Sequence, residues 1–135
     1  MTDKIKHDIS SISDIEFMVN SFYKKTEMDE YLGPVFKEHI NDWNKHLPVM
    51  YQFWSSMLLA SQTYKGNPFE KHKHLPIDPK HFERWISIFI ENLDEHFEGK
   101  ITEQAKFLAK NVAMTFQVRL GFNLNDEQLK KYQTL

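Results

Sequence analysis

The residues best suited to chemistry are histidines gathered in one proline-rich stretch. His72, His74 and His81 lie within residues 67–85, and Asp78 lies among them. Imidazole nitrogens and carboxylate oxygens are common ligands of zinc and iron in proteins. The stretch is therefore a candidate metal-binding site, the alternative being that His72 is a solvated histidine in a loop, and two arrangements of a metal site fit the sequence.

The first arrangement is the site of a zinc- or iron-dependent helical hydrolase that uses His72, His74 and Asp78. Residues two apart on a helix point about 200° from each other, so His72 and His74 would not easily share one ion. This hydrolase is the alternative to the interpretation that follows.

The second arrangement uses one histidine as the axial ligand of a haem iron, with apolar helices around the macrocycle. The chain has 11 Phe, 5 Tyr and 3 Trp, and so many rings can fill a core or line a flat hydrophobic cofactor. His72 falls on a short segment between Pro68, which suits the start of a helix, and Pro76, which ends one. Because so short a helix has little stability of its own, a bond from His72 to a metal would help to hold it.

Composition excludes several other classes of function. A chain of 135 residues is one domain by length, and the absence of cysteine excludes disulfides, thiolate metal sites and a cysteine nucleophile. Only 4 glycines, with no phosphate-binding loop among them, argue against a nucleotide ligand. The net charge of -2 offers no basic stripe for nucleic acid, and neither a secretory leader nor a long apolar run is present. We expect a cytoplasmic protein without nucleic-acid or membrane partners.

The elements that would position these groups are all helical, since apolar residues recur every three to four positions and never alternate. The first predicted helix starts at a Ser13-x-x-Glu16 capping box and carries Tyr23 on its buried face. A buried tyrosine hydroxyl needs a partner, either a backbone group or a polar spot inside an apolar pocket. Gly33-Pro34 then predicts a turn.

Three further helices are predicted after that turn. One is capped by Asn41 or Asp42, but it is expected to be regular only from Pro48 onward. The next starts at Asp78-Pro79 and stops at Gly99, and the last runs from Thr102 to Gly121.

Several motifs in order resemble the group III truncated haemoglobins. They are Phe22-Tyr23, Gly33-Pro34-Val35-Phe36, Trp43-x-x-His46-Leu47, Phe53-Trp54, Pro68-Phe69-x-x-His72-x-x-Leu75-Pro76 and His81-Phe82-x-x-Trp85. The resemblance covers residues 15–120 and implies a truncated globin fold, a two-over-two helical sandwich around haem b. It divides the chain into a flexible N-terminal lead (1–9), a globin domain (10–121) and a polar C-terminal tail (122–135).

The resemblance also implies roles for individual residues. His72 would be the proximal ligand of the haem iron, and Tyr23, His46 and Trp85 would form the distal ligand-binding pocket. Further residues would contact the cofactor: Phe36, Leu47, Met50, Phe69, Leu75, Phe82 and Arg84. Arg84 and Lys71 are candidate partners of the haem propionates, and His74 and His81 are expected at the surface or on the propionate side.

The function implied is reversible binding of dioxygen and other diatomic ligands, namely NO and CO. Several donors around a bound ligand would hold it tightly, which favours ligand chemistry or detoxification of nitric oxide or reactive oxygen species over transport. An NO dioxygenase or peroxidase-like activity would need an external reductase. The protein is expected to be a monomer.

Overall fold

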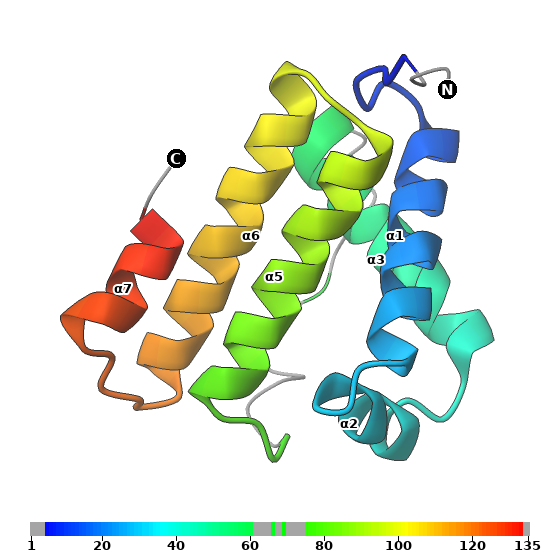
Figure 1. The fold of residues 1–135 in the computed structure, drawn as a ribbon. Coiled ribbons are helices and arrows are strands. Elements are labelled where there is room, and N and C mark those ends of the chain that lie inside the picture. Colours follow the sequence, from blue (N-terminus) through cyan, green and yellow to red (C-terminus); the bar gives the residue numbers. More distant parts are fainter. Residues whose placement is uncertain (1–4, 61–65, 67–68, 70–74, 134–135) are drawn as a thin grey trace.

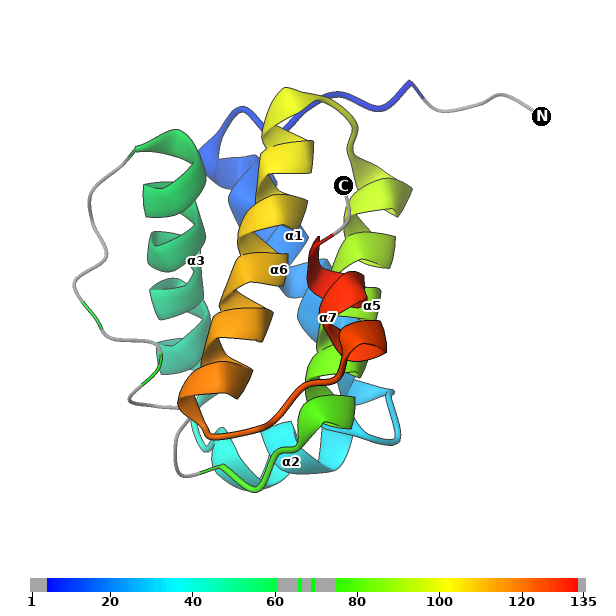
Figure 2. The ribbon, with the colours of Figure 1, turned by 90° about the vertical axis from the view of Figure 1, so that its left-hand side faces the viewer.

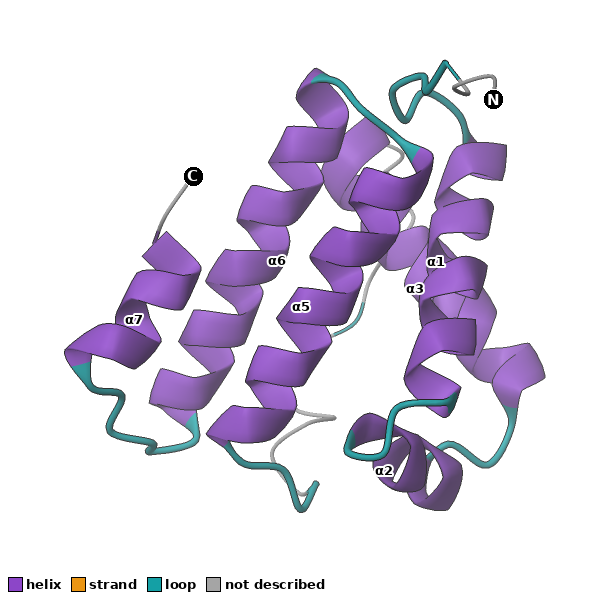
Figure 3. Cartoon of the chain, viewed as in Figure 1, coloured by secondary structure: helices purple, strands orange, loops and turns teal. Residues whose placement is uncertain are grey.

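The computed structural model describes residues 5–60, 66, 69 and 75–133. Its described helices are α1 (Ile12–Glu27), α2 (Leu32–His39), α3 (Trp43–Leu59), α5 (Pro79–His96), α6 (Lys100–Arg119) and α7 (Asp126–Gln133). Within these residues there is no strand (Figure 3). The predicted all-α class is confirmed.

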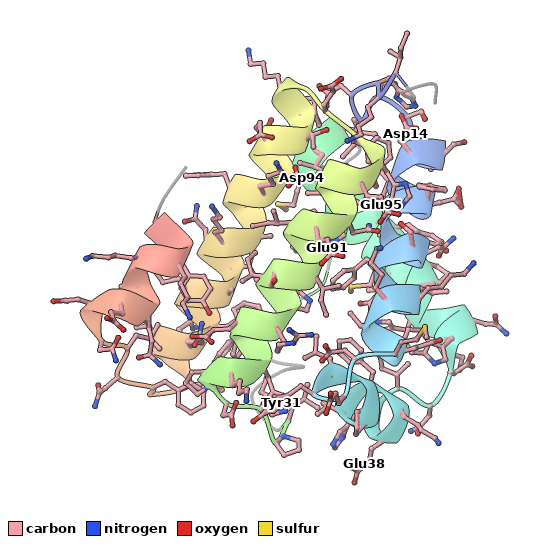
Figure 4. All side chains as sticks on the ribbon, viewed as in Figure 1. Asp14, Tyr31, Glu38, Glu91, Asp94 and Glu95 are labelled. Carbon is pink, nitrogen blue, oxygen red and sulfur yellow. The ribbon has the colours of Figure 1, made fainter. Side chains whose placement is uncertain are left out.

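Four of the helices form two packed layers (Figures 1 and 2). Helix α1 packs on α3 in one layer, and α5 packs on α6 in the other. Contacts of α1 with α5 and of α3 with α6 join the layers, while α2 lies beneath the end of α1 and α7 packs on α6. Between α5 and α6 a side-chain ion pair joins Asp94 to Lys106 at 2.5 Å, and Figure 4 labels Asp94 on α5. This two-over-two arrangement is the one that the resemblance to truncated haemoglobins implied.

The core lies between the two layers and is built from the predicted apolar stripes. The buried side chains of the central pair α1 and α5 include Ile15, Met18, Val19, Phe22, Phe82, Ile86, Phe89 and Leu93. Their spacing of three to four residues puts them on one face of each helix. The predicted amphipathic stripes on these two helices are therefore confirmed.

Helix α1 starts two residues earlier than the sequence predicted. Its N-cap is Ser11, whose side chain accepts a hydrogen bond from the Asp14 N–H at 3.2 Å, while the Asp14 carboxylate accepts one from the Ser10 N–H at 2.9 Å. The prediction of a cap at Ser13 was wrong because Ser11-x-x-Asp14 offers the same spacing of groups two residues upstream.

The turn predicted at Gly33-Pro34 is instead part of α2. Proline is tolerated in the first turn of a helix, where its missing N–H would have no helical partner. Gly33 is needed for close packing, because a Cβ there would lie 2.7 Å from the carbonyl oxygen of Glu27 in α1. Glycine and proline therefore mark a helix start here.

Helix α3 also differs from its prediction, because it is regular from Trp43 and runs on through Pro48. The Asp42 side chain caps it by accepting from the Asn44 N–H at 3.0 Å, and the Asp42 carbonyl accepts from the His46 N–H at 3.1 Å. This cap fixes the first turn, so the helix persists although Pro48 lacks a donor. As a result His46 sits on a regular helix.

Helix α5 begins as predicted, with Asp78 as N-cap and Pro79 at its first position. The N-cap predicted at Thr102 for α6 was wrong. Gly99 occupies that position with φ of 140°, and the carboxylate that accepts from the Thr102 N–H (2.8 Å) and hydroxyl (2.7 Å) belongs to Asp8. Ile9, next to Asp8, is 1% exposed. Asp8 and Ile9 thus lie within the predicted N-terminal lead (1–9), yet they pack on the globin domain and anchor the start of α6.

None of the described helices is both long enough and apolar enough to cross a membrane.

Candidate ligand pocket and its Tyr23–His46 pair

A cavity of about 420 Å³ lies among α1, α2, α3 and the start of α5. Its apolar wall comes from Leu32, Val35, Phe36, Ile40, Val49, Met50, Leu75 and Ile77. The exposed residues Asn41, Asp42 and Lys45 form a polar rim. Such a space, mostly apolar with a few convergent polar groups, is typical of small-molecule and cofactor sites.

The polar groups on this wall include three residues predicted for the ligand site, namely Tyr23, His46 and Trp85. The Tyr23 hydroxyl lies 3.0 Å from Nε2 of His46. Tyr23 comes from the second half of α1 and His46 from the first turns of α3, so the packing of these two helices creates the pair. The sequence left open two partners for the Tyr23 hydroxyl, and the structure gives it a side-chain partner in an apolar pocket.

The Tyr23 ring is held by other rings. Phe36 of α2 lies 5.7 Å away between centroids, and Trp43 of α3 lies 5.1 Å away, both edge to face. Aromatic pairs prefer this geometry. Burial raises the pKa of the Tyr23 phenol above its ordinary value, because the anion would lose its hydration there. Tyr23 is therefore a neutral hydroxyl that can both donate and accept a hydrogen bond.

Trp85 reaches the cavity from α5. Its ring stacks on Phe89 at 5.4 Å and 15° and meets Phe22 edge to face at 5.9 Å. These contacts lie one turn further along α5 and on α1, so they set the plane of the indole from inside the core. Trp85 thus brings an indole held by ring packing to the same cavity lining as Tyr23.

The residues predicted to contact the cofactor fall into two groups. Phe36, Met50 and Leu75 line the cavity. The others lie away from its lining: Leu47 and Phe82 pack in or on the core, Phe69 meets Phe116 at 5.5 Å, and Arg84 binds Asp29. For this second group, contact with a cofactor stays a prediction.

The Arg84 guanidinium binds the carboxylate of Asp29. Burial alone would raise the pKa of the Asp29 carboxyl, but hydrogen bonds from Arg84 and from the N–H groups of Leu32 and Tyr31 hold that pKa below its usual range. The carboxylate accepts both N–H groups at 3.0 Å, at the start of α2, and Arg84 Nε donates to it at 3.1 Å. This network fixes α2, and hence Phe36, against α5.

The predicted metal ligand His72 lies outside the described residues, as do His74 and Lys71. Among the residues that are described, no cluster of three or more histidines, cysteines or carboxylates could hold a metal ion. Asp78, the carboxylate of the hydrolase alternative, caps α5 and accepts from the His81 N–H at 3.1 Å. Its Oδ1 is therefore already engaged by the backbone of α5.

Sequence reasoning did not place His81 on the cavity wall, where the structure finds it. Its Nδ1 lies 2.9 Å from the Asp78 carboxylate, and its ring lies 4.7 Å from that of Tyr31, which Figure 4 labels near the start of α5. The spacing Asp-Pro-x-His was the available signal, because the third helical position reaches back to the cap.

The cavity suits haem in the chemistry of its lining. A porphyrin needs an apolar slot with aromatic walls, and a ligand bound to its iron needs hydrogen-bond donors on one side. Here Phe36, Met50 and Leu75 supply apolar walls, while Tyr23 and Trp85 supply donors. A two-over-two helical fold around such a pocket defines the class of haem-enclosing proteins, the globins.

Comparisons with known proteins identify the family. Residues 7–118 match the model of the bacterial-like globins. The chain is 31% identical over 116 residues to the group 3 truncated hemoglobin ctb of Campylobacter jejuni, across 79% of this chain and 91% of that one. It also matches the crystal structure of group III truncated hemoglobin from Campylobacter jejuni, with a TM-score of 0.80, 28% identity, and coverage of 90% of this chain and 100% of the other.

The chain therefore belongs to the bacterial-like globin family and has the truncated globin fold. Haem binding and oxygen binding follow from membership of that family. The resemblance to group III truncated haemoglobins is confirmed, and the globin interpretation replaces the hydrolase alternative.

Proposed function

We propose that this globin binds dioxygen and other diatomic ligands reversibly at haem b in the described cavity. His72 is the protein ligand of the iron, and Tyr23, His46 and Trp85 face the bound gas. The observation that carries the proposal is the Tyr23–His46 pair at 3.0 Å in a cavity whose lining is mostly apolar. Burial of polar groups in an apolar lining is costly unless they form hydrogen bonds. Tyr23 and His46 bond to each other, and a bound ligand would accept a further hydrogen bond from the pair.

Haem b supplies an iron atom that binds a diatomic ligand and passes partial negative charge to it. Tyr23 and Trp85 would then donate hydrogen bonds to that charge. The Tyr23 hydroxyl has one proton, and its use depends on the tautomer of His46. When Nε2 carries a proton, it donates to the Tyr23 oxygen, and the phenol proton is free to point at the ligand.

Trp85 supplies a second donor that cannot act as an acceptor, since an indole nitrogen only donates. Its stacking on Phe89 and its edge contact with Phe22 keep the ring in place before any ligand arrives. Donors fixed in advance stabilise charge without a cost of reorganisation. Two such donors favour long retention of the gas.

The position of His72 in the sequence supports its role. It lies three residues from Phe69, which packs on α6, and three from Leu75, which lines the cavity. Three residues span at most about 11 Å, and Leu75 lines the cavity, so the length of chain between Leu75 and His72 is compatible with a ligand role for His72. A neutral imidazole there would bind the iron as its protein ligand, and the haem would supply the iron that binds the gas.

Tight retention of oxygen favours chemistry over delivery. The reaction that fits is oxidation of nitric oxide to nitrate, balanced as NO + O₂ + e⁻ → NO₃⁻. The electron comes from an external reductase. Within the chain, the donors Tyr23 and Trp85 would hold the oxygen in place until nitric oxide enters, and the apolar walls would exclude water from the reacting atoms.

Absorption spectra of the purified protein test haem binding and the role of His72. We expect a Soret band that shifts when carbon monoxide is added to the reduced protein. The variant His72→Ala should lose most of its haem, whereas the matched control His74→Ala should keep it. Unchanged haem content in His72→Ala would refute the assignment of His72 as iron ligand, and a protein that contains zinc and does not take up haemin would refute the proposal as a whole.

Turnover is tested by adding nitric oxide to the oxygenated protein together with a chemical reductant. Detoxification predicts about one nitrate per nitric oxide consumed over many cycles. Release of intact oxygen with little nitrate would show instead that the protein delivers its ligand.

A further inference from the structure

We infer that Trp43 is a positioning residue that holds His46 against Tyr23. This inference rests on the proposed function, because it concerns the same ligand-facing pair. It adds a residue that does not line the ligand cavity and acts on the gas through its two neighbours.

Three rings pack together beside the cavity. The Trp43 centroid lies 5.1 Å from that of Tyr23 and 5.7 Å from that of His46, and the Tyr23 and His46 centroids are 5.4 Å apart. All three pairs meet edge to face, at 70°, 84° and 75° respectively. Each ring therefore restricts the rotation of the other two, and the Tyr23–His46 hydrogen bond forms one side of this triangle.

The helix explains why Trp43 reaches His46. Trp43 is the first residue of α3 and His46 comes three residues later, so the two side chains lie on one face of the helix. Side chains on a helix lean toward its N-terminus, which brings the imidazole over the indole. Asp42 caps this turn at the Asn44 N–H and so fixes where Trp43 begins.

Trp43 is half-buried and is not among the residues that line the cavity. Tyr23 and His46 both line it. The Trp43 indole thus contacts both residues of the pair without lining the cavity itself. His46 lines the cavity together with the exposed residues Asp42 and Lys45, so we expect its rotation away from Tyr23 to widen the opening toward solvent.

Removal of the indole should therefore have two linked effects. The imidazole gains room to leave Tyr23, so the 3.0 Å hydrogen bond is lost in part of the population, and gas enters through a wider opening. A smaller ring at the same position keeps much of the edge-to-face contact. Trp43→Phe should accordingly restore most of what Trp43→Ala loses.

Nitrogen NMR of ¹⁵N-histidine-labelled protein gives the first readout, because the Nε2 shift of His46 reports its hydrogen bond. In Trp43→Ala we expect that shift to move toward the value in Tyr23→Phe, where the partner is absent, and in Trp43→Phe to stay near the parent value. Carbon monoxide association, measured by flash photolysis, should be about tenfold faster in Trp43→Ala.

A matched control and a double variant separate this role from general loss of stability. Phe97→Leu removes a buried ring that packs on Phe17 in the first half of α1, so it should lower the unfolding temperature and leave both readouts unchanged. In a His46→Ala background, Trp43→Ala should no longer speed association, because the residue it positions is gone.

A parent-like His46 shift together with parent-like association in Trp43→Ala would overturn the inference. Equal acceleration by Trp43→Ala with and without His46 would also overturn it. Tyr23→Phe tests the proposed function separately: if it changes oxygen release while Trp43→Ala changes neither readout, only the role of Trp43 fails. If Tyr23→Phe changes nothing, the ligand role of the pair fails first.

Discussion

The hydroxyl of Tyr23 and Nε2 of His46 lie 3.0 Å apart on the wall of a cavity whose lining is mostly apolar. One residue comes from α1 and the other from α3, and 22 residues separate them in the sequence. The Tyr23 hydroxyl has one proton, which it can donate either to Nε2 of His46 or to a bound gas. The tautomer of His46 therefore decides whether the Tyr23 proton is available to the gas.

Burial of Tyr23 predicts a dependence of stability on alkaline pH. Burial raises the pKa of this phenol in the folded state, whereas the unfolded chain ionises near pH 10. Above about pH 10 the unfolded state binds fewer protons than the folded one, so the free energy of unfolding falls as pH rises. Urea unfolding between about pH 8 and pH 11 should show a smaller fall in Tyr23→Phe than in the parent.

Tyr51→Phe is the matched control for that titration. The Tyr51 hydroxyl donates to Asn20 at 2.5 Å and does not line the cavity. The free energy of unfolding of Tyr51→Phe should therefore change with pH as that of the parent does. Equal slopes for the parent and Tyr23→Phe would contradict the burial of an un-ionised phenol at position 23.

Asp29 should contribute strongly to stability, because its carboxylate accepts two backbone N–H groups and the Arg84 guanidinium. Asp29→Ala should lower the free energy of unfolding by about 2–3 kcal/mol at neutral pH, a cost typical of hydrogen bonds to a charged group. Because the pKa of Asp29 is held below its usual range, this contribution is present above about pH 4 and is lost as pH falls through the folded-state pKa.

Denaturant unfolding at neutral and acidic pH measures that contribution. Glu30→Ala, at the exposed neighbouring position, is the control and should change the free energy of unfolding by less than about 0.5 kcal/mol. A difference between parent and Asp29→Ala that stays constant down to about pH 2 would contradict the assigned role of the carboxylate.

Asp8 should act as a helix cap supplied from outside the helix. Its carboxylate accepts from the Ile101 and Thr102 N–H groups at 2.9 and 2.8 Å, so Asp8→Ala should cost about 1–2 kcal/mol. Thermal unfolding of Asp8→Ala and of the exposed control Glu98→Ala checks this. Equal unfolding temperatures for the two variants would show that α6 does not depend on the N-terminal segment.

The sequence predicted the fold class and the core because both depend on repeated local signals. The stripes of α1 and α5 repeat apolar residues every three to four positions, and Asp78-Pro79 combines an N-cap with a proline at the first helical position. Such signals lie within a few residues of each other, so one sequence contains them completely.

The predictions that failed depend on contacts distant in the sequence. Nothing near Thr102 indicates that Asp8 would cap its helix, and the need for Gly33 comes from the backbone of α1 at Glu27. The same limit applies to the site. Tyr23, His46 and Trp85 were named through resemblance to a family, but the support that Trp43 gives to two of them is visible only after the helices have packed.

The rate of oxygen release from Tyr23→Phe tests the central claim most directly. Loss of a hydrogen bond to a charged ligand should speed release by about tenfold to a hundredfold, measured by stopped-flow displacement of oxygen with carbon monoxide. Tyr51→Phe, mixed under the same conditions, should release oxygen at the parent rate. If Tyr23→Phe also releases oxygen at the parent rate, its hydroxyl does not contact the ligand, and the account of this pocket is wrong.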